Sequence, residues 1–126
     1  MGVCSFHPLR VELVSFYIDQ FPENDIGRAL AKEHGVPIYS SINQALCCGG
    51  GELAVDGVIM VGEHGDYPWN EKGQHLFPRK YFMEQICGVF ASSSRSCPVF
   101  NDKHLSYNWQ DTPWGGAAAC CTPLSL

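Results

Sequence analysis

The feature that most constrains the fold is a short apolar run that ends in glycine and charge, within residues 56–68. Residues 58–61 are apolar without alternation, which is typical of a parallel strand covered on both faces. Glu63, His64 and Asp66 follow the run and place two carboxylates and an imidazole within four residues. Because ligands bind at the carboxyl ends of parallel strands, the stretch predicts a buried strand that carries one wall of a ligand site.

Capping signals predict two short helices in the first half of the chain. Asn24 or Asp25 can cap the first helix, and Gly35 stands where a left-handed residue commonly ends a helix. Ser41 and Gln44 have the Ser-x-x-Gln spacing of a capping box. This spacing predicts a second, brief helix before the glycines at 49–51.

A third helix is predicted to begin at Pro78, since proline is well suited to the first turn. Phe82, Ile86, Val89 and Phe90 follow at i, i+4, i+7 and i+8, which is the spacing of one apolar stripe. We expect this stripe to lie in the core of the domain.

Three further segments are rich in β-branched or aromatic residues and are predicted to be strands, at 11–18, 36–39 and 97–100. Strands therefore alternate with helices along the chain, which predicts an α/β fold. We expect a partial Rossmann-like three-layer domain over residues 11–114, with a mostly parallel sheet of about four strands and right-handed crossovers.

Composition excludes several classes of protein. The chain has 126 residues, a net charge of −5 and no run of Lys or Arg, which disfavours nucleic acid and anionic membranes as partners. No apolar stretch approaches the roughly 20 residues of a membrane span. Residues 1–10 lack the pattern of a signal peptide, so a cytoplasmic location is expected. The seven cysteines are accordingly expected to be free thiols.

Charged side chains follow three of the predicted strands, at the edge where such sheets bind ligands. They are Asp19, Glu63, His64, Asp66, Asp102, Lys103 and His104. Lys103 and His104 are candidates for proton transfer, because lysine and imidazole can both be tuned towards neutral pH. His64, Asp66 and His104 would form a metal-binding set of two imidazoles and a carboxylate if their strands were neighbours. The structural alternative for all of these residues is a hydrogen-bonded or solvated turn.

The remaining aromatic and histidine residues suggest no chemistry. Tyr67 and Trp69 are expected to pack within the loop after the central strand. His7, His34 and His75 are expected to be surface histidines without a partner.

Four stretches of the chain resemble the nucleotide-binding domain of the glucose–fructose oxidoreductase and inositol dehydrogenase family (Gfo/Idh/MocA), in particular a bacterial branch of it. They are Tyr-Ile-Asp-Gln-Phe-Pro-Glu-Asn-Asp at 17–25, Ala-Lys-Glu-His-Gly-Val-Pro-Ile-Tyr at 31–39, Val-Asp-Gly-Val at 55–58 with Gly-Glu-His-Gly-Asp-Tyr-Pro at 62–68, and Pro-Val-Phe-Asn-Asp-Lys-His-Leu-Ser-Tyr at 98–107. Their order and spacing carry the resemblance more than any single motif does.

The resemblance implies a Rossmann domain that binds NAD or NADP and transfers hydride to or from a sugar-like or polyol substrate. In that family an acidic residue at the place of Asp19 holds the ribose, and a lysine at the place of Lys103 lies near the nicotinamide. We accordingly expect cofactor binding by Asp19 and Glu63, and substrate binding by Asp66 and Asp102. Catalysis is expected from Lys103, His104 and His64.

The chain departs from the family pattern in three respects. Asp102-Lys103-His104 replaces the family's Glu-Lys-Pro, and no Gly-x-Gly-x-x-Gly turn precedes Val11. The substrate domain is also missing. We therefore expect a truncated or frameshifted reading frame without turnover, with residues 1–10 unassigned and an irregular tail of foreign sequence at 115–126.

Two alternatives stay open from the sequence. One is a non-enzymatic Rossmann-like domain that binds a small ligand or a partner at the same edge. The other is a metal-dependent hydrolase that uses Glu63, His64, Asp66 and His104. A small-molecule substrate is the expected partner in the enzymatic readings, and a homo-oligomer is compatible with the sequence.

Overall fold

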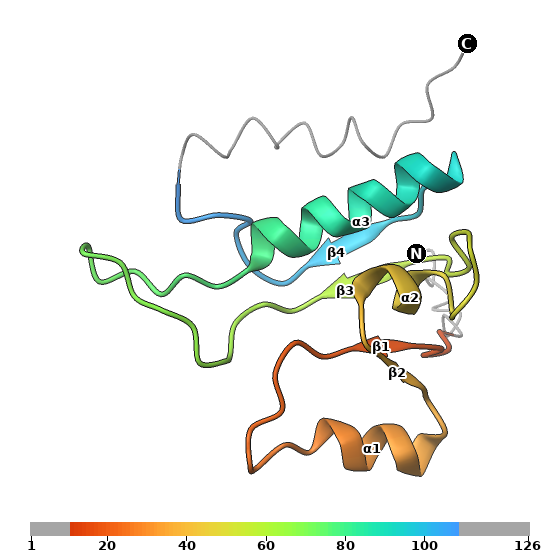
Figure 1. Cartoon of the computed structure of the whole chain (residues 1–126), viewed down its shortest axis with the longest axis horizontal. Helices are drawn as coiled ribbons and strands as arrows, with labels where there is room; N and C mark the ends of the chain where they lie inside the picture. Colours follow the sequence, from red (N-terminus) through yellow and green to blue (C-terminus); the bar gives the residue numbers. More distant parts are fainter. Residues whose placement is uncertain (1–10, 109–126) are drawn as a thin grey trace, which may run out of the picture.

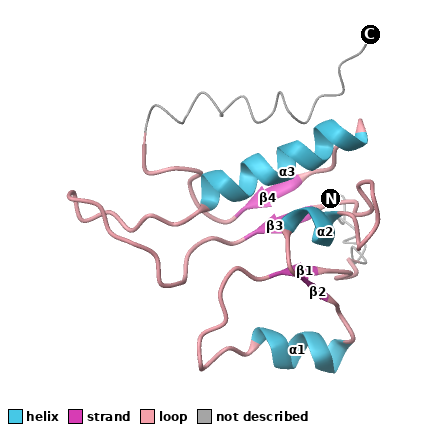
Figure 2. Cartoon of the chain, viewed as in Figure 1, coloured by secondary structure: helices cyan, strands magenta, loops and turns pink. Residues whose placement is uncertain are grey.

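A computed structural model describes residues 11–108 of the chain. The elements are β1 (Phe16–Tyr17), α1 (Gly27–His34), β2 (Ile38–Tyr39), α2 (Ile42–Leu46), β3 (Val58–Met60), α3 (Arg79–Ser93) and β4 (Val99–Asn101). Figures 1 and 2 show them in this alternating order, as the sequence predicts. The predictions for residues 1–10 and for the tail at 115–126 lie outside the described residues.

The strands form two separate parallel pairs. β1 pairs with β2, β3 pairs with β4, and no described strand joins the two pairs. The α/β class with parallel strands is thus confirmed, whereas the expectation of one sheet with about four strands is wrong for the described residues. Within the described residues each strand therefore has one paired edge and one unpaired edge.

Proline limits the length of both pairs. The Phe16 N–H donates to the Pro37 carbonyl at 2.9 Å, and the Val58 N–H donates to the Pro98 carbonyl at the same distance. In each parallel ladder the next bond towards the N-terminus would come from the N–H of that proline, and proline has none. The predicted strand at 11–18 is therefore wrong in its first half, where Val14 is exposed.

Side chains from one face of the β3–β4 pair join α2 and α3 in a single buried core. α2 and α3 pack on each other, and α2 also packs on β1 and β2. The stripe predicted on α3 is confirmed, because Ile86, Val89 and Phe90 are buried and Phe82 packs against them. The buried cluster consists of Ile42, Leu46, Cys47, Leu53, Val55, Met60, Met83, Ile86, Val89, Phe90 and Cys97. Each fully buried aliphatic side chain contributes about 1.5–3 kcal/mol, so this cluster holds β3, β4 and both helices together.

The other face of the same pair is exposed. Ile59 and Phe100 are paired in register, and their exposed fractions are 71% and 64%. Val61 follows at 61%. The expectation that residues 58–61 are covered on both faces is therefore wrong: Met60 is buried in the core, whereas Ile59 and Val61 on the other face are exposed. With one face bare, the described part of the chain does not form three layers at β3–β4.

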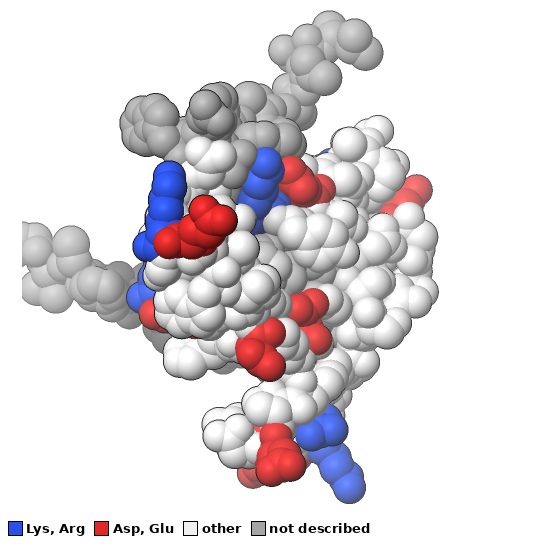
Figure 3. Space-filling view, turned by 60° about the vertical axis from the view of Figure 1, so that its left-hand side comes forward, with Lys and Arg blue, Asp and Glu red and all other residues white. Residues whose placement is uncertain are grey.

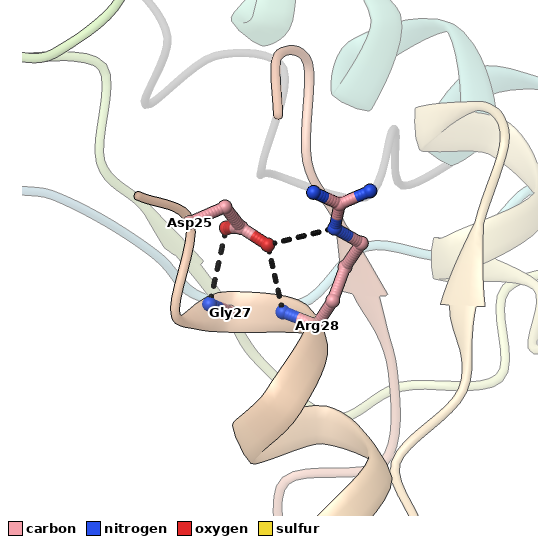
Figure 4. Close-up of polar contacts among 3 residues, drawn as sticks. All are labelled: Asp25, Gly27 and Arg28. Atoms are coloured by element: carbon pink, nitrogen blue, oxygen red, sulfur yellow. Dashed lines mark hydrogen bonds and ion pairs between the residues drawn. The ribbon is translucent and has the colours of Figure 1, made fainter. Parts of the chain in front are cut away.

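Asp25 makes the cap of α1, as Figure 4 shows. Its carboxylate accepts hydrogen bonds from the backbone N–H groups of Gly27 and Arg28, at 3.0 and 3.1 Å. It also pairs with Arg28 Nε at 2.9 Å. The backbone N–H of Arg28, more than any other contact, lowers the pKa of Asp25. Of the two predicted caps, Asn24 and Asp25, the chain uses the second.

The predicted end of α1 is confirmed, and the predictions for the start of α2 and for the cysteines are confirmed in part. Gly35 ends α1 in the left-handed conformation, with φ of 67°. The Ser41 hydroxyl accepts from the Gln44 N–H at 3.1 Å and caps α2. The Gln44 side chain accepts from the Ser40 hydroxyl at 2.9 Å instead of returning to Ser41, so half of the predicted capping box forms. Cys47 and Cys48 carry free thiols. The longest described helix, α3, has 15 residues, and within 11–108 no helix combines the length and apolar character that crossing a membrane requires.

Candidate functional site

The loops after β3 and β4 bring one cation and two carboxylates together. Lys103 Nζ lies 3.4 Å from Glu63 Oε1 and 3.6 Å from Asp102 Oδ2. The hydrogen bond with Glu63, and next the charge of Asp102, raise the pKa of Lys103. The amine is therefore an ammonium group at neutral pH, and it offers hydrogen-bond donors rather than a base. All three side chains are partly exposed, so a ligand can reach them.

His104 lies beside a buried arginine. Arg79 Nη2 is 3.2 Å from His104 Nε2, and Arg79 Nη1 donates to the Gly62 carbonyl at 3.0 Å. A guanidinium group can only donate, so His104 Nε2 is the acceptor and the imidazole proton lies on Nδ1. The only nitrogen of His104 that can accept a proton is thus already in use, which argues against His104 as a general base in this arrangement.

Sequence reasoning missed Arg79, although its spacing carried a signal. Arg79 precedes Met83, Ile86 and Phe90 by four, seven and eleven positions, so it belongs to the buried stripe of α3. Its side chain is only 5% exposed. A Cβ atom at Gly62 would lie 2.6 Å from Arg79 Cγ, which means that glycine at 62 is what allows the arginine to pack there.

Asp19 is engaged by two tyrosines. The Tyr17 hydroxyl donates to Asp19 Oδ1 at 2.5 Å, and the Tyr67 hydroxyl donates to Oδ2 at 2.6 Å. Burial first, and then the hydrogen bond with Asp19, raise the pKa of Tyr17 to about 12 and also raise that of Tyr67. Both carboxylate oxygens therefore already accept a strong hydrogen bond from the protein.

Gln20, the residue after Asp19, also forms hydrogen bonds with the loop that carries Tyr67. Gln20 Oε1 accepts from the Asp66 N–H at 2.7 Å, and Gln20 Nε2 donates to the Asp66 carbonyl at 3.2 Å. We call the five residues Tyr17, Asp19, Gln20, Asp66 and Tyr67 the clasp. The clasp ties the loop after β1 to the loop after β3, at the carboxyl ends of the two separate strand pairs.

The other predicted site residues do not converge. His64 and the side chain of Asp66 are exposed, and His64 makes no hydrogen bond within residues 11–108. No group of three His, Cys, Asp or Glu side chains in that range could hold a metal ion, so His64, Asp66 and His104 are not gathered into a ligand set. The hydrolase alternative therefore has no metal centre in the described residues.

The loop aromatic residues pack as expected, but one histidine does not match its prediction. Tyr67 lies edge-on to Phe77 at 6.0 Å, between ring centroids. His75 stacks on Trp69 at 4.3 Å between ring centroids, and His75 Nε2 is hydrogen-bonded to the Tyr67 carbonyl at 2.8 Å. The expectation that His75 has no partner is wrong; it is a structural part of this loop.

The charged groups are mixed on the surface near this edge. Figure 3 shows acidic and basic side chains interspersed, without a continuous basic area on that face. The candidate site of the described residues is thus a small edge with an ion cluster and a buried guanidinium group, separate from the clasp. Comparison with models of protein families, with curated proteins and with solved structures gives no match to this chain.

Proposed function

We propose that this chain is a small-ligand-binding domain of Rossmann-like type, and that its ligand is a hydroxyl-bearing molecule such as a sugar or polyol. The observation that carries the proposal is the contact of Lys103 with Glu63 and Asp102, at 3.4 and 3.6 Å. It concentrates donors and acceptors at the carboxyl ends of two parallel strands, which is where ligands bind in α/β sheets.

A hydroxyl group suits this cluster because it donates and accepts at the same time. It can accept from the Lys103 ammonium group while it donates to the Glu63 carboxylate. Exposed ion pairs contribute only about 0.2–1 kcal/mol, so exchanging one of them for a ligand hydroxyl costs little. The resemblance to the Gfo/Idh/MocA family supports the same class of ligand.

A second candidate is an NAD(P)-dependent oxidoreductase. It is favoured by Lys103, which the raised pKa keeps protonated and able to donate to the oxygen of a carbonyl or alcohol substrate. The clasp argues against it, because the ribose hydroxyls would have to compete with Tyr17 and Tyr67 for the oxygens of Asp19. The described residues therefore do not fit the adenosine half of the cofactor, and ligand binding without turnover ranks first.

The first proposal is tested by saturation-transfer NMR with myo-inositol and glucose. We expect transfer to the ligand, with a dissociation constant on the order of millimolar for so small a ligand. The signal should be lost in Lys103→Met and kept in Lys72→Met, which removes an exposed lysine from the loop before α3. No transfer in the wild type, or equal transfer in both variants, would contradict the proposal.

The second candidate is tested by the fluorescence of NADH. Enhancement on mixing that is lost in Asp19→Asn and kept in Asp56→Asn would favour the oxidoreductase. Asp56 is a suitable control because it lies before β3, is almost fully exposed and, among residues 11–108, is paired with Arg95 alone. Absence of enhancement in the wild type would remove this candidate.

A further inference from the structure

We infer that Arg79 and the first turn of α3 bind the anionic group of a small ligand, a carboxylate or a phosphate. The position is next to Lys103 and His104, so the inference deepens the proposed function and rests on it for the ligand's hydroxyl groups. If this inference holds, the ligand is an acidic sugar or a sugar phosphate rather than a neutral polyol.

The first observation is a buried charge that the described residues leave uncompensated. Arg79 is 5% exposed, and no carboxylate of residues 11–108 lies within ion-pair distance of it. Its two hydrogen-bonded partners are neutral, namely the Gly62 carbonyl and the His104 imidazole. The face of the Phe77 ring, 5.2 Å from the guanidinium carbon, is its third neighbour. Buried charges are normally paired, because an unpaired one is costly to desolvate.

The second observation is a donor without an acceptor. Arg79 Nε is buried and has no hydrogen-bond partner within the described residues. Guanidinium groups bind carboxylates and phosphates through two parallel N–H donors, and Nε with one Nη nitrogen forms such a pair. Nη2 is the nitrogen held by the exposed His104 side chain, so a stronger, charged acceptor can replace that contact.

The third observation is the helix end itself. α3 has 15 residues, begins at Arg79 after Pro78, and has neither a side-chain cap nor an acidic residue in its first turn. The first-turn N–H groups carry the positive end of the helix dipole, which attracts anions. Arg79 is the first residue of α3, so the unpaired guanidinium group and the uncapped helix end both favour a negative group at the start of this helix.

Asn101, the last residue of β4, suggests that the ligand also carries a hydroxyl group. Asn101 Oδ1 is the other buried side-chain atom without a partner in residues 11–108. Asn101 is paired in register with Met60, two positions before the Gly62 carbonyl that Arg79 holds. An oxyanion satisfies Arg79 Nε, and a hydroxyl group satisfies Asn101 Oδ1. A hydroxylated acid or sugar phosphate supplies both.

The test is a titration of ¹⁵N-labelled protein with inorganic phosphate and, separately, with glucuronate, followed by NMR. We expect saturable shifts of the Arg79 Nε–H resonance and of the backbone amides of Lys80 and Tyr81. The dissociation constant should rise by about tenfold or more in Arg79→Gln and be unchanged in Arg95→Gln. Arg95 is the matched control because it lies just beyond the other end of α3 and is paired with Asp56 at 2.9 Å. Whichever probe binds more tightly identifies the anion as phosphate or carboxylate.

Two results would overturn the inference: no saturable shift of these resonances with either anion, or an equal dissociation constant in Arg79→Gln. If Arg79→Gln does not fold, Arg79→Lys keeps the charge but lacks the two-donor edge, and the same weakening is expected. Failure of the proposed function is separate, because it is read from myo-inositol and glucose. Anion binding without polyol binding would leave the anion site standing and remove the proposed class of ligand.

Discussion

Tyr67→Phe tests the clasp most directly, because it removes one hydroxyl oxygen and leaves the ring that packs against Phe77. The lost bond is the 2.6 Å contact with Asp19 Oδ2. Hydrogen bonds to charged groups contribute about 1.5–3 kcal/mol to stability. Asp19 is exposed and water can replace the tyrosine, so we expect a loss of stability below this range, about 1–1.5 kcal/mol. For a domain of this size each kcal/mol lowers Tm by about 4–8 °C.

The assay is thermal unfolding followed by circular dichroism at neutral pH. Tyr39→Phe is the matched control, since the Tyr39 hydroxyl makes no hydrogen bond within the described residues. Tyr17→Phe alone and combined with Tyr67→Phe completes a double-mutant cycle, and the two effects should not add because both hydroxyls share one carboxylate. The reasoning is refuted if Tm of Tyr67→Phe equals that of Tyr39→Phe.

Two further predictions concern the same loops. The pKa of Tyr17 is raised to about 12 and that of Tyr67 is also raised, whereas tyrosine in the unfolded chain titrates near 10. The neutral phenols therefore stabilise the fold fully below about pH 10, and this contribution is lost as the pH rises through the folded pKa values. Urea midpoints from about pH 8 to about pH 11 should fall less steeply in the Tyr17→Phe/Tyr67→Phe double variant; equal slopes would show that other groups cause the fall. Gly65→Ala should lower the free energy of unfolding by about 1 kcal/mol or more, and with it the urea midpoint, because Gly65 has φ of 138° and a Cβ atom there would clash with the Tyr67 ring. An unchanged midpoint would mean that the loop adapts without strain.

The sequence was sufficient to predict features that depend on residues close together in the chain, such as helix caps, helix ends and the apolar stripe of α3. Asp25 and Ser41 cap helices because their side-chain oxygens reach N–H groups two or three residues away. Gly35 ends α1 because the left-handed conformation suits glycine. The stripe on α3 follows from helical periodicity alone. In each case the interacting groups are close in sequence, so the residue types are sufficient.

The sequence was not sufficient to predict contacts between segments that lie far apart in the chain. An apolar run at 58–61 indicates a strand but not which of its faces is covered, and here Met60 is buried in the core whereas Ile59 is exposed. The contact between Asp19 and Tyr67 joins residues 48 positions apart. A charged residue is rarely assigned to a buried stripe, so Arg79 was passed over even though its position fits the spacing.

The separation of the strands into two pairs has a consequence for how the chain folds. β1, α1 and β2 close a unit within residues 16–39, and β3, α3 and β4 close a second within residues 58–101. Neither ladder takes a strand from the other unit, so the backbone pairing of each is made within its own stretch of chain. α2 lies between them in the chain, and its Ala45 carbonyl accepts from the Ser15 hydroxyl at 2.8 Å, just before β1. α2 and the clasp therefore join the two units, so folding of the whole domain depends on these contacts as well as on the two ladders.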